Sequence, residues 1–137
     1  MPFEELPHTA DFCLHVWASD MATLFVESAR GMNDLAGYGL DENSKAERTF
    51  STSAMDPESL LVAFLSELIY FAEKDHLAFD RFDLELDINF DKISNISTTL
   101  HGAAILSTKK MIKAVTYHNL KIQKTVKGFE VEIVFDV

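Results

Sequence analysis

The chain lacks the residues on which several common protein classes depend. A single cysteine among 137 residues, Cys13, excludes an internal disulfide framework and a zinc site built from cysteines. Positive charge is also scarce, because 12 lysine and arginine residues face 22 aspartate and glutamate residues and the net charge is −10. With a pI near 4.8, the chain is not expected to bind nucleic acid through a broad basic face.

Long apolar runs and several catalytic signatures are missing as well. No stretch reaches the roughly 20 apolar residues of a membrane span, and the opening MPFEE lacks the basic and apolar regions of a secretory signal. There is no phosphate-binding glycine loop, no HExxH and no GxSxG sequence, and the histidines are scattered. We therefore expect a cytoplasmic protein without membrane association.

The chain does contain ample material for a hydrophobic core. Apolar residues make up 47% of it and include 11 phenylalanines, which excludes wholesale disorder. The length corresponds to one domain, which we place at residues 1–137.

Apolar residues at helical spacing predict two amphipathic helices. The first begins at a cap formed by Ser19 or Asp20 and runs to about Ala36, before a glycine-rich turn. The second begins where Asp56 can cap free amides and the following proline suits the first helical position, and it ends near Asp75.

Most of the remaining chain is predicted to form β-strands. The predicted strands are Phe12–Ala18, Arg48–Ser53, Phe82–Phe90, Ile93–Gly102, Ala103–Leu106, Ile112–His118, Leu120–Thr125 and Phe129–Val137. Apolar and polar residues alternate strictly in several of them, which is typical of antiparallel sheets with one buried face. The predicted fold class is therefore α+β, a single-domain sandwich of mostly antiparallel sheet with the two helices packed on one sheet face.

Two segments carry polar groups in unusual places. The cluster PHTAD, residues 7–11, comes directly before a predicted strand. It is either a turn in which Thr9 or Asp11 bonds to the local backbone or a functional site. At the other end, a strand runs straight into Asp136 and Val137 without a polar tail, so the strand is either simply cut off there or holds its α-carboxylate on a sheet.

Several short motifs together resemble the archease family. They are PHTAD at residues 7–11, LF and ARGM within residues 24–32, LL and LSELIY within residues 60–70, KAVTYH at residues 113–118 and IVFDV at residues 133–137. The resemblance runs in order over essentially the whole chain. The chain departs from the family pattern in residues 101–110, where HGAA and a Lys109-Lys110 pair replace a Gly-Glu pair and acidic residues.

The resemblance implies a non-enzymatic activator of an RtcB-type RNA ligase. Such a ligase joins RNA ends that carry a 3′-phosphate or 2′,3′-cyclic phosphate to a 5′-hydroxyl, using GTP and a divalent metal, in tRNA splicing and RNA repair. Archeases promote guanylylation of the ligase and its repeated turnover through transient contact. The resemblance also implies a divalent cation, with calcium expected, bound by Asp11, Asp136 and Val137.

The chemistry of these three residues agrees with that implication. Asp11 and Asp136 carry carboxylate oxygens and Val137 can offer a main-chain oxygen, which are the ligands that Ca²⁺ and Mg²⁺ prefer. Like charges brought together repel one another, so such a cluster favours a cation or a lysine from a partner. Three protein ligands would leave coordination positions open.

Three further residues are functional candidates. Lys113 is either a solvated strand residue or a positive group that meets a phosphate or carboxylate in the ligase complex. His8 and His118 either donate hydrogen bonds to the carboxylates or are packed or surface histidines.

Two other function classes stay open from the residues alone. In one, Asp11, Asp136, His8 and His118 form a small metal-dependent hydrolase or nuclease, although no nucleophile motif is present and an acidic surface repels polyanions. In the other, the chain is a chaperone-like interaction module without a metal.

Overall fold

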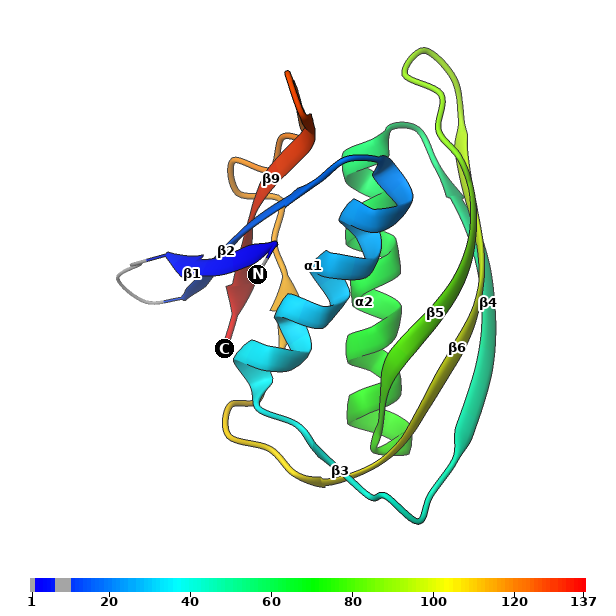
Figure 1. Cartoon of the computed structure of the whole chain (residues 1–137), viewed down its shortest axis with the longest axis vertical. Coiled ribbons are helices and arrows are strands. Elements are labelled where there is room, and N and C mark those ends of the chain that lie inside the picture. Colours follow the sequence, from blue (N-terminus) through cyan, green and yellow to red (C-terminus); the bar gives the residue numbers. More distant parts are fainter. Residues whose placement is uncertain (1, 7–10) are drawn as a thin grey trace.

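Two antiparallel sheets enclose a middle layer formed by two helices (Figure 1). The computed structural model describes residues 2–6 and 11–137, so His8 and the rest of Pro7–Ala10 lie outside the described residues. No helix in the described ranges is both long enough and apolar enough to cross a membrane.

The first sheet, here called the terminal sheet, joins strands from both ends of the chain. It consists of β1 (Phe3–Leu6), β2 (Phe12–Ala18), β7 (Ala114–Val115), β8 (Gln123–Thr125) and β9 (Gly128–Asp136). The order is β1-β2-β9-β7, and β8 also pairs with β9, so both short strands lie along the same edge of β9. All of these pairings are antiparallel.

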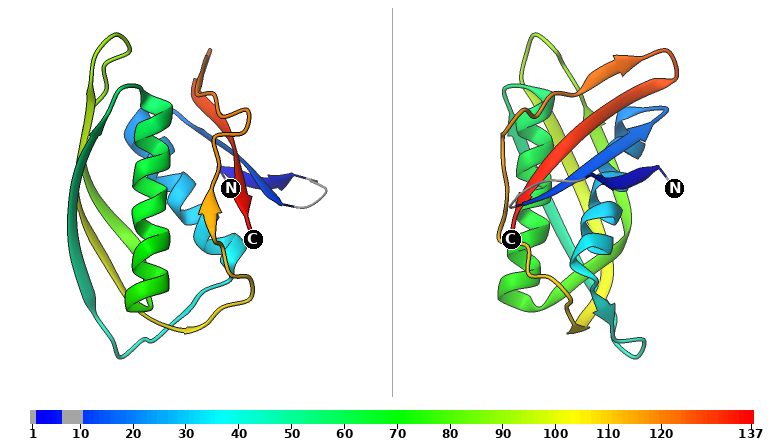
Figure 2. Two further views of the ribbon diagram at one scale, coloured as in Figure 1. Left: turned by 180° about the vertical axis from the view of Figure 1, so that it is seen from behind. Right: turned by 90° about the vertical axis from the view of Figure 1, so that its left-hand side faces the viewer.

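The second sheet, here called the long-strand sheet, is built around one central strand. Its members are β3 (Gly39–Leu40), β4 (Ala46–Ala54), β5 (Leu77–Asp87) and β6 (Ser94–Ser107). Strand β6 pairs with each of the other three, again antiparallel. This sheet covers the side of the helices opposite the terminal sheet (Figures 1 and 2).

The helices begin and end at local signals in the sequence. The N–H of Thr23 donates a 2.8 Å hydrogen bond to the Asp20 carboxylate at the start of α1 (Met21–Ala36), and Gly37 ends it at φ 64°. Asp56 caps α2 (Pro57–Asp75) in the same way, accepting a 2.7 Å hydrogen bond from the N–H of Ser59. Both predicted helices are confirmed with these bounds.

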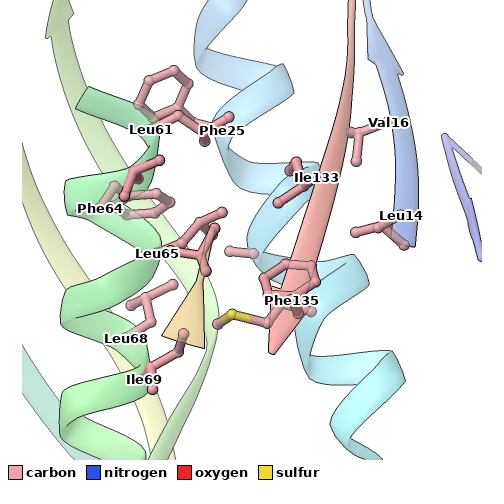
Figure 3. Close-up of a cluster of buried hydrophobic side chains, with 14 of the residues drawn as sticks. Leu14, Val16, Phe25, Leu61, Phe64, Leu65, Leu68, Ile69, Ile133 and Phe135 are labelled. Carbon is pink, nitrogen blue, oxygen red and sulfur yellow. The ribbon is translucent and has the colours of Figure 1, made fainter. Parts of the chain in front are cut away.

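The core lies on both sides of α2. Figure 3 shows Leu65 of this helix turned toward the buried side chains of β9, and Leu61 beside Phe25 of α1. On its other side, the Phe64 ring lies 5.8 Å from that of Phe25 and 6.1 Å from that of Phe82 in the long-strand sheet. The predicted α+β class is confirmed, and the helices are covered by a sheet on each side.

Several strand bounds differ from the predicted ones because partner strands decide where a strand ends. Strand β5 begins at Leu77 and ends at Asp87, so Phe90, predicted as part of it, lies in the following turn with 66% of its surface exposed. The two pieces predicted at 93–106 form the single strand β6. Strand β1 was not predicted, and of Ile112–His118 only Ala114–Val115 forms a strand, β7, although the N–H groups of Lys113 and Thr116 also bond to β9.

Candidate functional site

The register of the terminal sheet brings distant parts of the chain together at one end of β9. Phe12 of β2 is paired with Phe135, and Ala114 of β7 is paired with Asp136. Extending the β2–β9 register by one residue places Asp11 opposite Asp136. Asp136 therefore lies between the start of β2 on one side and β7 on the other.

Alternation along the strands decides which way these residues point. Ile133 and Phe135 are fully buried against the helices, so Asp136, which is exposed, belongs to the opposite, outward face. Directly opposed residues of an antiparallel pair share a face, so the same register continued to Asp11, which lies in a bend just before β2, would turn Asp11 outward as well. Val137 packs its side chain against the core, so a main-chain oxygen is what it can offer to a ligand.

Lys113 meets this end of β9 through its backbone. Its N–H donates a 2.8 Å hydrogen bond to the carbonyl oxygen of Asp136. The exposed Lys113 residue also lines a groove of about 480 Å³ between the end of α2 and the chain that follows β6. Ile69 and Glu73 of α2 are among the groove residues. The structure thus places the Lys113 backbone next to that of Asp136, and the residue beside a partly apolar groove.

Of the two histidines predicted as functional candidates, the structure describes only His118. His118 lies exposed in the turn after β7, where its ring Nε2 is 3.3 Å from the side-chain nitrogen of Asn119. His8, predicted to donate a hydrogen bond to the carboxylates, lies outside the described residues. Within residues 2–6 and 11–137, no three His, Cys, Asp or Glu side chains form a group able to hold a metal ion.

The donor set expected at this end of β9 consists of oxygen atoms only. Two carboxylates, from Asp11 and Asp136, and a main-chain oxygen of Val137 fit a hard cation such as Ca²⁺ or Mg²⁺ and suit a soft metal poorly. Such a set does not fill the six to eight positions of calcium, so water or a partner's groups would complete the shell.

A second polar group on the outward face was not singled out from the sequence. The ring nitrogens of His15 lie 3.4 Å from the carboxylates of Glu4 and Glu130, which come from the neighbouring strands β1 and β9. The His15 ring also lies 5.1 Å from that of Trp17. Only the alternation of β2, which turns His15 and Trp17 the same way, signals this cluster in the sequence.

Cys13 is buried on β2, as expected for a packing residue. Burial raises the pKa of its thiol, and the negative charge of Glu132 raises it further. A thiol held in its neutral form is a poor nucleophile and a poor metal ligand. Cys13 therefore adds nothing to the candidate site.

The fold defines a class: an α+β protein with two helices between antiparallel sheets, in which β2 pairs with β9 near the two ends of the chain. The Archease protein family matches residues 3–137 of the chain. The chain belongs to the archease family.

Individual relatives agree with this assignment. A protein archease from Methanosarcina acetivorans is 31% identical, with 98% of this chain and 95% of the relative covered. A protein archease-like from Dictyostelium discoideum is 29% identical, with 98% of this chain and 93% of the relative covered.

Two solved structures share the fold. A solution structure of a Methanobacterium thermoautotrophicum protein has a TM-score of 0.71 at 21% identity, with 99% of both chains covered. The crystal structure of an archease, possible chaperone, from Thermotoga maritima also has a TM-score of 0.71, at 19% identity, with 98% of this chain and 96% of that chain covered.

Proposed function

We propose that this protein is a metal-binding activator of an RtcB-type RNA ligase. One observation carries the proposal: residues from three motifs of the archease resemblance that are far apart in the sequence come to one end of β9. Asp11, the last residue of PHTAD, directly precedes β2, KAVTYH contains β7, and IVFDV ends β9, and the register pairs β9 with both other strands. Such convergence is more than packing requires, because the polar members point away from the core.

In this proposal Asp11 and Asp136 bind a divalent cation, expected to be calcium, and Val137 adds a main-chain oxygen. A bound cation supplies positive charge that offsets the repulsion between the carboxylates and can attract a phosphate or a nucleotide. The open part of the coordination shell suits a site that meets a partner's active centre during a transient contact.

Lys113 is proposed to act on the same partner. Its exposed ammonium group is a compact positive charge on a flexible stem, able to reach a phosphate or carboxylate brought to the end of β9. The groove beside Lys113, partly lined by α2, offers apolar surface for a segment of the partner. Asp136, Lys113 and the groove would then form one contact surface.

The test measures cation binding and ligase activation in one set of variants. Calcium titration by calorimetry and a multiple-turnover ligation assay with RtcB-type ligase, GTP and cleaved tRNA halves are applied to wild type, Asp136→Asn and Asp11→Asn. Removing one carboxylate removes a charged ligand, so calcium affinity is expected to fall about tenfold or more and activation to fall with it. Asp91→Asn, which neutralises an exposed carboxylate in the turn between β5 and β6, is the matched control and is expected to leave both unchanged.

Three outcomes would contradict the proposal. Normal activation by both site variants removes the metal role from Asp11 and Asp136. Cleavage of the RNA by this protein without the ligase supports the hydrolase or nuclease class of metal enzyme instead. Activation that persists without calcium, with the ligase's own divalent metal kept in the assay, supports the chaperone-like module, the role suggested by the words "possible chaperone" for the Thermotoga maritima protein.

A further inference from the structure

Charge is distributed very unevenly along this acidic chain. Between Asp91 and Glu130 there are seven lysines and no aspartate or glutamate. Six of these lysines fall within residues 109–127: Lys109, Lys110, Lys113, Lys121, Lys124 and Lys127. All six are exposed. We call this segment the lysine edge.

From Lys113 onward the lysine edge follows one side of the terminal sheet, whereas Lys109 and Lys110 lie at the end of α1, where their N–H groups donate to the Ala36 carbonyl. Strand β7 pairs with the end of β9 at Asp136, and β8 pairs with its beginning at Gly128. Eight residue steps of a strand span about 27 Å, at about 3.4 Å for each step. Figure 2, in its right-hand view, shows this gold and orange segment along the margin of the molecule.

The lysine edge forms no ion pairs within the described part of the chain. None of the six ammonium groups forms an ion pair with a described carboxylate, and that of Lys110 lies 5.1 Å from the centre of the Phe12 ring. Acidic groups do lie nearby: Asp136 next to β7, Glu130 and Glu132 on β9, and Glu58, whose carboxylate accepts the N–H of Ile122. The lysines nevertheless remain available to an outside anion.

The shape of the lysine edge suits a long, flexible anion. Lys121 lies beside outward residues of β9, whereas Lys124 is paired with Phe129, which packs against the core, so the two start from opposite faces of the edge. The long lysine side chains allow both ammonium groups to reach a flexible anion that lies along the edge. In the middle of the row, Tyr117 is 62% exposed and offers a ring on which a base can stack.

We propose that the lysine edge binds the phosphate backbone of single-stranded RNA. Rows of cations combined with an exposed aromatic ring are typical of single-strand binding, whereas lysine is depleted in protein–protein interfaces. The binding is local and does not involve a broad basic face. This inference rests on the proposed function: the bound RNA is a substrate end of the ligase, because the part of the edge along the terminal sheet starts at Lys113, whose N–H bonds to the Asp136 carbonyl.

The experiment measures binding of a fluorescent 20-nucleotide single-stranded RNA to the protein alone, by anisotropy, over a range of salt concentrations. Each phosphate contact contributes about 0.7 to the slope of log K against log salt. The triple variant Lys121→Gln, Lys124→Gln, Lys127→Gln is therefore expected to lower the slope by about two. The matched control Lys45→Gln, Lys74→Gln, Lys92→Gln removes three lysines outside the edge and is expected to keep the wild-type slope.

A separate variant tests the stacking step. Tyr117→Ala is expected to weaken RNA binding about fivefold or more at every salt concentration without changing the slope. Absence of RNA binding at low salt, or equal slopes for the two triple variants, overturns the proposal. Poly-glutamate that competes as well as RNA at equal charge also overturns it and assigns the edge to an acidic protein. Because the ligase is absent, failure here is distinguishable from failure of the activator function.

Discussion

At the scale of single residues, Thr98 has an unusual environment. It lies on the buried face of β6, paired with Phe50 on one side and Leu84 on the other. Its hydroxyl is buried without a hydrogen-bond partner, the only such side-chain atom found among the described residues. An unsatisfied buried hydroxyl costs free energy that an apolar group of similar shape does not.

We expect Thr98→Val to raise the free energy of unfolding by about 1 kcal/mol, since valine keeps the β-branched shape and removes the hydroxyl. Urea denaturation measures the change. The control is Thr99→Val on the opposite face of the same strand, expected to change stability by less than about 0.5 kcal/mol. A less stable Thr98→Val protein would show that the hydroxyl is satisfied in solution.

The candidate site illustrates what single residues reveal in a sequence. The chemistry of Asp11 and Asp136 indicates oxygen ligands, but nothing in their own segments says that they meet. The pairing of Phe12 with Phe135, residues at opposite ends of the chain, is what brings their segments side by side. Only the family resemblance linked the two aspartates before the structure did.

At the scale of elements, the helices were predictable because their ends are determined locally. The residues that begin or end a helix act within a few positions of it: Asp20 and Gly37 at the ends of α1, and Asp56 at the start of α2. Strand ends depend on partners far away in the sequence. Within the predicted strand Ile112–His118, the chain turns away after β7: the N–H of Leu120 bonds to the Tyr117 carbonyl and Asn119 has φ 52°. The alternation of side chains cannot reveal that departure.

Gly102 of β6 tests how tightly β5 and β6 are packed where their register shifts between Phe79 and Arg81. A Cβ atom at residue 102 would overlap the Ala78 carbonyl oxygen and lie 2.6 Å from the Cα of Phe79. Both obstacles are backbone, so neither can rotate away. We expect Gly102→Ala to cost about 2 kcal/mol or more in urea denaturation.

Gly39 provides the comparison for this substitution. A Cβ atom there would meet the side-chain hydroxyl of Ser107, which can adopt another rotamer. We expect Gly39→Ala to cost clearly less than Gly102→Ala. Equal costs for the two variants would mean that the strands around Gly102 shift to accommodate the methyl group.

At the scale of the whole molecule, the helical layer links the two sheets. The rings of Phe25, Phe64 and Phe82 connect α1, α2 and β5, while Leu65 of α2 faces β9. Neither sheet can lose its partner layer without exposing the apolar surface of the helices. Unfolding is therefore expected to be a single cooperative transition.

Phe64→Ala tests this connection. Loss of a fully buried ring is expected to lower the free energy of unfolding by about 3–5 kcal/mol. Fluorescence of Trp17, which lies in the terminal sheet, and far-UV circular dichroism should give coincident urea transitions before and after the substitution. Phe90→Ala, at an exposed turn position, should change neither curve. Separate transitions for the two signals would show that the terminal sheet unfolds by itself.

The pairing of β2 with β9 also has a consequence for biosynthesis. Asp11 leaves the ribosome more than 100 residues before Asp136, and in the interval β2 has no neighbour on the side that β9 later occupies. The buried residues Leu14 and Val16 must wait for that strand, because long-range pairing is slow and cannot begin before it is synthesised. A nascent chain interrupted after β6 would hold both helices and every strand of the long-strand sheet, yet Asp11 would face water without Asp136. The terminal sheet is therefore completed only after β9 has been synthesised.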